Sequence, residues 1–340
     1  MDTTFRWGIM GAGAISHAFL SGVKQVRGAK AVAIASRNRA HAQAVADRFE
    51  IETVEDNYES LAAREDLDAV YVCTPHTAHM EIAALALQRG QNVLCEKPMC
   101  INVAQAQELE ALAVQNQVFL MEGFWTAFFP CIERISTLIK EQAIGRVRMI
   151  DARFCFRTPS NDKQQRLLNP MLAGGALLDV GVYPLHFCQQ ILGSAPLSIT
   201  GYASINADEY QFGVDEQAVM IAQYPDQVLA TMACAVKTKM EEYAHIVGEK
   251  GEIYLKPFWR PDHFVLKNAS GDHEYYLPIL SDDQDFPDTG FQYEIRHVQD
   301  CVLKKRLNSP VVSWEMTNNV LRACDMLRAR WGLIYPCEFV

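Results

Sequence analysis

The 340-residue chain lacks several features that mark particular classes of protein. Its first residues, MDTTFRWGIMGAG, contain no basic segment followed by a long apolar stretch, so we expect no secretory signal. No apolar run approaches the roughly 20 residues of a membrane-spanning helix, so we expect no membrane partner. Internal repeats, low-complexity tracts and long linkers are missing from the sequence as well.

An excess of positive charge is also missing. The chain has 31 Lys and Arg against 41 Asp and Glu, a net charge of −10, which argues against nucleic acid or an anionic membrane as a partner. Its ten cysteines are scattered, and several lie in apolar segments. We interpret them as small buried side chains in a reducing compartment and expect a cytoplasmic protein.

The length exceeds what one hydrophobic core usually serves, so we expect two domains. The first part of the chain alternates short apolar runs, typical of strands, with amphipathic helical segments. This alternation predicts an α/β domain over residues 1–123, a doubly wound parallel sheet of the Rossmann type. The expected strands are FRWGIM, AKAVAIASR, DAVYVCTP, NVLCEKP and VFLMEGF.

From residue 124 the pattern changes to strands joined by turn signals. This predicts an α+β domain over residues 124–340 with a large, open, mostly antiparallel sheet that binds substrate and mediates oligomerisation. One helix interrupts the strands and two close the chain, of which the last is expected to pack back on the first domain. The expected strands lie in VRMIDARFCFR, LSITGYASINA, QAVMIAQYP, QVLATMACAVKT, EYAHIVGEKGEIYLK and HFVLKNASGDHEYYLPI.

The run GAGAIS, residues 11–16, is a glycine loop between an expected strand and an expected helix. Its first glycine permits a tight turn, its second lets the backbone approach a pyrophosphate, and the serine is small enough for close packing. The unpaired N–H groups of the helix then face the phosphates. We expect Gly11, Gly13, Ala14 and Ile15 to bind a dinucleotide; a structural glycine turn is the alternative.

The second strand ends at Ser36 and Arg37 and lacks the acid that usually binds the ribose 2′-hydroxyl of NAD. Arg37 can bind a 2′-phosphate through charge-assisted hydrogen bonds, and Ser36 can donate another. An arginine is unfavourable at the start of a helix, which favours a ligand over a solvated surface charge. We expect NADP as the cofactor, with NAD possible.

The next strand is followed by CTPHTAH, residues 73–79. The C-x-x-H-x-x-H spacing suggests zinc, but the sequence supplies no clear fourth ligand or second shell, so we expect no metal. The favoured interpretation is a loop along the cofactor, with Thr74, Pro75, His76 and His79 as candidates. For His79 the alternative is a plain residue at the start of a helix.

Two further motifs make the chain similar to a known family. Glu96-Lys97-Pro98 follows a strand, and GGALLDVGVY spans residues 174–183. With the glycine loop, they resemble the Gfo/Idh/MocA oxidoreductases over essentially the whole chain. Tyr183 and the upstream MEGFWTAFFP are similar to the branch of dimeric dihydrodiol dehydrogenase, NADP-dependent D-xylose dehydrogenase and glucose-fructose oxidoreductase. Ala127 stands where that branch often has arginine.

The resemblance implies that Lys97, Asp179 and Tyr183 lie beside the nicotinamide ring, and that Glu96 and Lys97 belong to the cofactor site. Hydride transfer at a carbinol carbon needs a proton carrier and a group that stabilises the alkoxide. A phenol of pKa about 10 becomes a useful base when a cation lowers that pKa. Tyr183 therefore suits the acid/base and Lys97 the cation, with Asp179 on the same helical face. The alternatives are a core tyrosine, a surface lysine and a helix-capping acid.

Candidates for contacts with substrate follow from position and side-chain type. Aromatic rings suit a sugar or diol pocket but equally fill cores. Polar side chains before the glycine pair of the second motif can bind hydroxyls or stay solvated, and a histidine seven residues after Asp179 returns to the same face. These candidates are Trp125, Phe128, Asn161, Arg166 and His186.

These features predict an NAD(P)-dependent oxidoreductase, with NADP preferred, that acts on a secondary alcohol or carbonyl of a sugar, cyclitol or cyclic trans-diol. A non-catalytic NAD(P)-sensing regulator of the same fold is the alternative, and a non-redox use of tightly held NAD is a third. Apolar residues on one sheet face, in QAVMIAQY and VLATMACAV, predict a homodimer or higher oligomer. The substrate and the physiological direction stay open.

Overall fold

The computed structural model describes residues 4–159, 165–206, 212–279 and 290–339. Contacts between Cα atoms divide the chain into two compact units. The first holds the chain up to Cys100, Ala104–Trp125 and the segment that ends at Trp314, and the second holds Ile101–Val103, Thr126–Pro278 and the C-terminal part from Glu315. The predicted boundary at residues 123 and 124 lies beside the division at Trp125.

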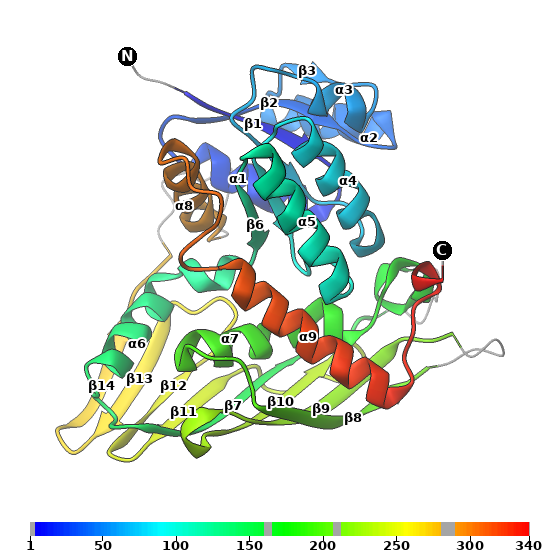
Figure 1. Ribbon diagram of the computed structural model, residues 1–340. Coiled ribbons are helices and arrows are strands. Elements are labelled where there is room, and N and C mark those ends of the chain that lie inside the picture. The colour runs from blue at the N-terminus through cyan, green and yellow to red at the C-terminus, as the bar shows by residue number, and fades with distance from the viewer. Residues whose placement is uncertain (1–3, 160–164, 207–211, 280–289, 340) are drawn as a thin grey trace. The chain divides into compact units, whose positions relative to one another are not determined.

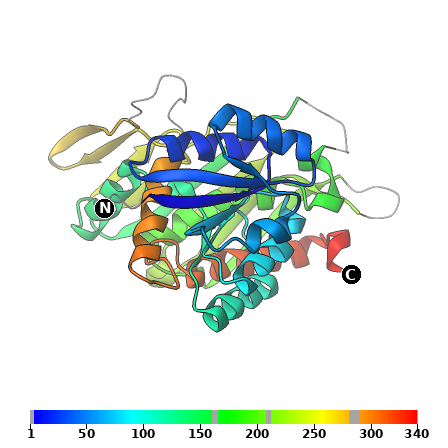
Figure 2. The same cartoon turned by 90° about the horizontal axis from the view of Figure 1, so that it is seen from above.

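The first unit is a six-stranded parallel sheet in the order β3-β2-β1-β4-β5-β6. Helices α1 and α2 lie on one face of this sheet and α4 and α5 on the other (Figure 2). This confirms the predicted doubly wound sheet. Its elements are β1 (Phe5–Met10), α1 (Ala14–Lys24), β2 (Ala29–Ala35), α2 (Arg39–Phe49), β3 (Thr53–Val54), α3 (Tyr58–Ala62), β4 (Ala69–Val72), α4 (His76–Gln88), β5 (Val93–Glu96), α5 (Val103–Asn116) and β6 (Leu120–Gly123).

The central strands of this sheet are buried on both faces, which is why they are apolar up to Glu96 at the end of β5. Their register aligns Ala35, Met10, Val72 and Cys95 in one row across β2, β1, β4 and β5. The loops that follow these strands therefore leave the same edge of the sheet. In an open α/β sheet this carboxyl edge is where ligands bind.

Helix α8 (Phe291–Leu303) comes from far along the chain and packs on α1. A Cβ atom on Gly22 of α1 would lie 2.8 Å from the Cβ of Phe291, so only glycine permits this approach. The ring of Phe291 also stacks on Trp125, with centroids 4.8 Å apart. The helix that packs on α1 is therefore α8, whereas the expectation concerned the last helix of the chain. Packing of that last helix on the first domain stays a prediction.

The second unit contains an eight-stranded sheet in the order β14-β13-β12-β11-β7-β10-β9-β8, in which β7–β10 is the parallel pair and the other pairs are antiparallel. This confirms the predicted mostly antiparallel sheet (Figure 1). Its strands are β7 (Val147–Cys155), β8 (Ser198–Ile205), β9 (Asp215–Gln223), β10 (Leu229–Ala235), β11 (Ala244–Gly248), β12 (Gly251–Leu255), β13 (His263–Asn268) and β14 (Gly271–Tyr276).

Helices α6 (Pro130–Lys140), α7 (Val182–Leu192) and α9 (Trp314–Trp331) lie on one face of this sheet (Figure 1). Buried and exposed residues alternate along β9 because every second side chain points away from these helices. The alternation is interrupted where Ser204 pairs with Gln217 and Ile205 pairs with Asp215. Glu216 is therefore an extra residue, a β-bulge that changes the direction of the side chain before it.

The stretch Pro170–Leu192 is apolar and long enough to cross a membrane, by length and composition only. The expectation that no run approaches this length was therefore wrong. Within the structure, 89% of its most apolar 18-residue window is buried, as in the core helix of a folded unit. The stretch contains a π-helical turn (Leu177–Gly181) followed by α7.

Candidate functional site

The glycine loop lies at the carboxyl end of β1, and its shape requires both glycines. Gly11 has φ +127°, and a Cβ there would lie 2.7 Å from the carbonyl oxygen of Cys73. Gly13 precedes α1, and a Cβ there would meet no atom within 4 Å. The loop thus joins a tight turn to an open space at the start of a helix.

This open space fits a dinucleotide. Gly13 has no side chain with which to cap α1, so the first N–H groups of the helix face the space left open. Ser16 is fully buried, and its hydroxyl donates to the Gly13 carbonyl at 2.7 Å, which holds the loop against the helix. The predicted contacts of Ala14 and Ile15 lie in the same first turn.

Ser36 and Arg37 follow β2 directly beside the glycine loop, since the N–H of Gly11 donates to the carbonyl of Ala35 at 2.9 Å. The Arg37 side chain is exposed and makes no ion pair with any residue that the structure describes. Its neighbour Arg39 differs, because it forms a salt bridge with Asp56. A guanidinium that has no ion pair within the described residues, placed beside the glycine loop, suits a phosphate.

The loop after β4 is tied to the loop after β5 by His79. The two ring nitrogens of this buried histidine lie 2.8 Å from the carbonyl oxygens of Thr74 and Pro98. His79 therefore has its polar atoms engaged with the backbone of both loops, a contact that holds them together. His76, at the start of α4, is 5% exposed.

Lys97 follows β5 at the same edge, and the residue before it, Glu96, is a buried acid. Glu96 is buried and accepts hydrogen bonds from the Tyr71 hydroxyl at 2.5 Å and the Lys97 N–H at 3.3 Å. Burial raises the pKa of Glu96 to about 7, although Tyr71 and the charge of Lys97 oppose this. Burial and the charge of Glu96 also raise the pKa of Glu294 on α8 well above its usual range.

In the second unit the GGALLDVGVY motif forms the glycine turn, the π-helical turn and the start of α7. Asp179 is buried in the π-helical turn and pairs with Arg166, the Nη1 and Oδ1 atoms lying 2.9 Å apart. Tyr183 is 6% exposed, and the ring of Phe154 meets it edge-on at 5.0 Å. Phe154 stacks in turn on Trp259 at 5.0 Å. The structure thus unites Arg166 with Asp179 and gives Tyr183 an aromatic neighbourhood.

The other predicted substrate contacts have varied surroundings. Trp125 and Phe128 are half-buried and are the first and last residues of a 3-10 turn. The ring of Trp125 stacks on Phe291 of α8, as described above. His186 is completely buried on α7. Asn161 lies outside the described residues. In the part of the chain that the structure describes, no three His, Cys, Asp or Glu side chains are placed to hold a metal ion.

Comparisons with known proteins agree with this geometry. Residues 5–124 match the model of the Gfo/Idh/MocA oxidoreductases with an NAD-binding Rossmann fold, and residues 132–254 match the C-terminal domain of the same family. The chain belongs to the Gfo/Idh/MocA oxidoreductase family. It is therefore an NAD(P)-binding oxidoreductase, as predicted.

Relatives of this family member include trans-1,2-dihydrobenzene-1,2-diol dehydrogenases. The chain is 34% identical to that of Xenopus tropicalis over 339 residues, covering 97% of this chain and 99% of the relative. It is 31% identical to that of Homo sapiens over 340 residues, with 97% and 98% covered.

Solved structures show the same fold. The 3-ketoreductase KijD10 from Actinomadura kijaniata, in complex with NADP and TDP-benzene, is 25% identical, covers 96% of this chain and 98% of its own, and has a TM-score of 0.82. A levoglucosan dehydrogenase in complex with NADH and levoglucosan is 18% identical, with a TM-score of 0.84 and 96% and 97% of the two chains covered.

Sequence reasoning missed several residues of this oxidoreductase that lie beside the predicted ones. Phe154 and Trp259 belong to β7 and to the loop after β12, where they resembled ordinary core aromatics. Asp215 is the first residue of β9, and the alternation of apolar and polar residues in the sequence does not predict that it is buried. Glu294 lies in a helix with an ordinary amphipathic pattern, so only the packing of α8 reveals it.

The raised pKa of Glu96 predicts a pH-dependent stability. Between pH 4.5, the ordinary pKa, and about 7, the folded chain holds a proton that the unfolded chain has lost, so this contribution falls as the pH rises. Relative to Glu96→Gln, the wild type should lose about 2.5 kcal/mol of unfolding free energy between pH 5 and pH 8. Urea denaturation at both pH values measures this, and Glu81→Gln, an exposed acid, should show no such difference. Parallel pH curves for wild type and Glu96→Gln would contradict the assignment.

Proposed function

We propose that the chain transfers a hydride between NADP(H) and a secondary alcohol or carbonyl of a sugar, cyclitol or cyclic trans-diol. The observation that carries the proposal is the row of loops after β2, β1, β4 and β5, which holds Arg37, the glycine loop and Lys97 at one sheet edge. The family membership and the names of the relatives support the same reaction class.

The preference for NADP rests on Arg37 and Ser36. A guanidinium binds a phosphate in a bidentate manner, whereas an NAD-specific site has a carboxylate for the 2′-hydroxyl. The KijD10 structure, solved with NADP, is consistent with this choice. When bound, the nicotinamide coenzyme would supply or accept the hydride.

The proton chemistry is assigned to Tyr183 and Lys97. Tyr183 would exchange a proton with the reacting oxygen, and the ammonium group of Lys97 would lower the pKa of the phenol and stabilise negative charge on the substrate oxygen. Asp179, held by Arg166, would orient the substrate hydroxyl. The meeting of Lys97 with Tyr183 and Asp179 stays a prediction from the resemblance.

The substrate class follows from the aromatic surroundings of Tyr183. Phe154 and Trp259, stacked at 5.0 Å, offer apolar ring faces beside the phenol. A sugar or a cyclic diol has an apolar C–H face that packs on such rings and hydroxyl groups that bind Arg166 and Asp179. Dihydrodiol, aldose and levoglucosan substrates are the panel that the relatives suggest.

Lys97→Ala and Tyr183→Phe should lower kcat by about a hundredfold or more, because each removes proton transfer or charge stabilisation in the transition state. NADPH affinity, measured by fluorescence titration, should change little. Steady-state kinetics over the sugar and diol panel gives kcat. Equal losses of kcat and NADPH affinity would make Lys97 a phosphate contact or a structural residue, and a wild type without NADP-linked turnover or nucleotide binding would refute the proposal.

Arg37→Ala should lower kcat/KM for NADP about tenfold to a hundredfold and leave the value for NAD nearly unchanged, since only NADP carries the 2′-phosphate. The matched control is Arg39→Ala, which removes a nearby guanidinium that already pairs with Asp56. A similar loss with both coenzymes, or the same loss in both variants, would show that Arg37 does not select the cofactor.

We also propose a homodimer through the sheet of the second unit. The face opposite α6, α7 and α9 exposes large apolar side chains on adjacent strands, while Arg153 and Asp151 form a salt bridge on the same face at 2.8 Å. A patch with both apolar groups and both charges suits a self-complementary contact with a second copy. The apolar residues are Met149, Tyr202, Val219, Ile221 and Leu229, between 44% and 82% exposed.

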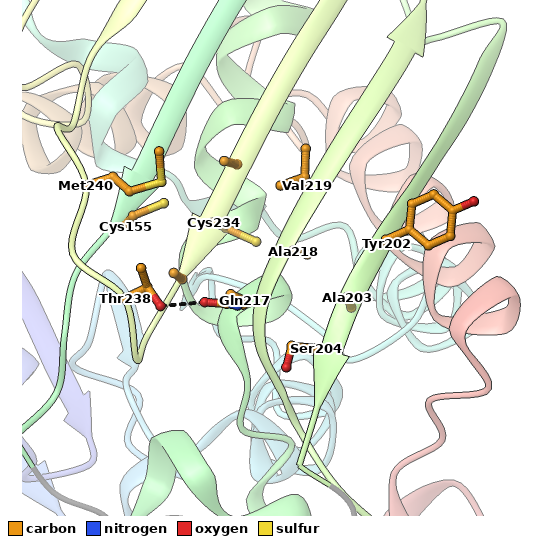
Figure 3. Close-up of a pocket in the computed structure, with 12 residues that line it drawn as sticks. Cys155, Tyr202, Ala203, Ser204, Gln217, Ala218, Val219, Cys234, Thr238 and Met240 are labelled. Atoms are coloured by element: carbon orange, nitrogen blue, oxygen red, sulfur yellow. Dashed lines mark hydrogen bonds between the residues drawn. The ribbon is translucent and has the colours of Figure 1, made fainter.

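A hollow of about 410 Å³ lies at one end of this face (Figure 3). Tyr202 and Val219 line it, together with Met240, and Thr238 donates a hydrogen bond to Gln217 beside them. None of the predicted site residues lines this hollow. We assign it to the dimer contact, because it continues the apolar patch.

Val219→Glu combined with Ile221→Lys should convert the dimer to a monomer, because it places charges at the centre of the apolar patch. Sedimentation velocity at micromolar concentration measures the change. The control is Leu303→Glu, a residue that is 72% exposed on α8. A wild type that sediments as a monomer would refute the dimer.

A further inference from the structure

Asp215 is a fully buried carboxylate at the start of β9, outside the residues assigned so far. Its Oδ2 atom accepts a hydrogen bond from the N–H of Leu177 at 2.6 Å. Its Oδ1 atom has no hydrogen-bond partner among the residues that the structure describes. Leu177 is the first residue of the π-helical turn, so the carboxylate lies at the start of the turn that carries Asp179 and leads into α7, which carries Tyr183.

The backbone around Asp215 is shaped to admit this carboxylate. The bulge at Glu216 interrupts the alternation of side chains along β9, so that the side chain of Asp215 points into the core. Gly175 has φ +112°, and a Cβ there would lie 2.2 Å from Oδ1 of Asp215. Both glycine and bulge are therefore needed for the carboxylate to reach the Leu177 N–H.

The same glycine turn is held from two other sides. The Tyr335 hydroxyl donates to the carbonyl of Gly174 at 2.9 Å, and the N–H of Gly175 donates to the carbonyl of Leu167 at 2.9 Å. Leu167 neighbours Arg166, the partner of Asp179. The contact with Asp215 is thus one of three that determine where the π-helical turn starts.

We infer that Asp215 is a positioning residue, whose carboxylate fixes the backbone at Leu177 and thereby places Asp179 and Tyr183 for the reaction. This inference rests on the proposed function. A charged acceptor at the start of a helix bonds the first N–H groups more strongly than a neutral one. Displacing catalytic groups by about 1 Å can cost about a hundredfold in rate.

The charge has a cost that argues against a purely structural role. Burial raises the pKa of Asp215 to about 7, against hydrogen bonds from the backbone and the charge of Arg328 that lower it. The other titratable groups that face it are Tyr335 and the Cys234 thiol of β10. Above pH 7 the folded chain must hold this group charged at a cost in stability, as happens where function requires a strained arrangement.

The test is Asp215→Asn, which keeps the shape and removes the charge. At pH 8 the midpoint of thermal unfolding should stay the same or rise relative to wild type, because the cost of burying the charge is gone. In contrast, kcat should fall about tenfold or more, with the dissociation constant of NADPH unchanged. A merely structural residue would lose stability and activity together.

Gly175→Ala supplies an independent displacement of the carboxylate and should also lower kcat. Its control is Gly193→Ala at the other end of α7, which also has a positive φ, +67°, but no atom within 4 Å of the added Cβ. The control should cost stability without a comparable fall in kcat. Equal kcat losses in both glycine variants would overturn the inference.

Hydrogen exchange of the peptide spanning Ala176–Val180 provides a readout that needs no turnover. Asp215→Asn should speed exchange of these amides relative to Glu216→Gln, the neighbouring acid that is half-exposed. Unchanged exchange, or unchanged kcat in an active enzyme, would overturn the positioning role. If the wild type lacks NADP-linked turnover, the proposed function fails. In that case faster exchange in Asp215→Asn would still support the contact between Asp215 and the Leu177 N–H, and unchanged exchange would overturn that contact.

Discussion

The common register of β2, β1, β4 and β5 is the constraint on which the first unit depends. It aligns Ala35, Met10, Val72 and Cys95 in one row, so that the next residues of each strand leave the same edge. Parallel strands buried on both faces can keep such a register only if helices return the chain each time. The loops proposed to bind the cofactor are adjacent because the sheet is parallel, and His79 then joins two of them.

In the second unit the main constraint is the π-helical turn that precedes α7, which is buried in the core. A π-helical turn leaves backbone groups that need partners, and Asp215, Tyr335 and the turn at Leu167 supply them. The arrangement demands glycine at two successive positions, since a Cβ on Gly174 would lie 2.4 Å from the carbonyl of Arg166. The glycine pair of the motif is therefore a packing requirement as well as a family signature.

Buried acids recur beside both sets of proposed site residues. Glu96 accepts a hydrogen bond from the Lys97 N–H, and Asp215 accepts one from Leu177, at the start of the turn that carries Asp179. Burial raises the pKa of each acid to about 7. An acid held in a low-dielectric core costs stability unless its hydrogen bonds compensate. Both acids hold loops or turns whose positions the proposed chemistry needs, which gives a physical reason for carrying that cost.

The sequence by itself determined both sheets, because strand period, helix period and turn residues are local properties. The glycine loop, the lack of an acid at the end of the second strand, and the EKP and GGALLDVGVY motifs could also be recognised in the sequence, since each is a short contiguous pattern. Only the tertiary structure decided the bulge that turns Asp215 inward, the packing of α8 that buries Glu294, and the stacking of Phe154 on Trp259. These depend on contacts between residues far apart in the chain, which no local period records.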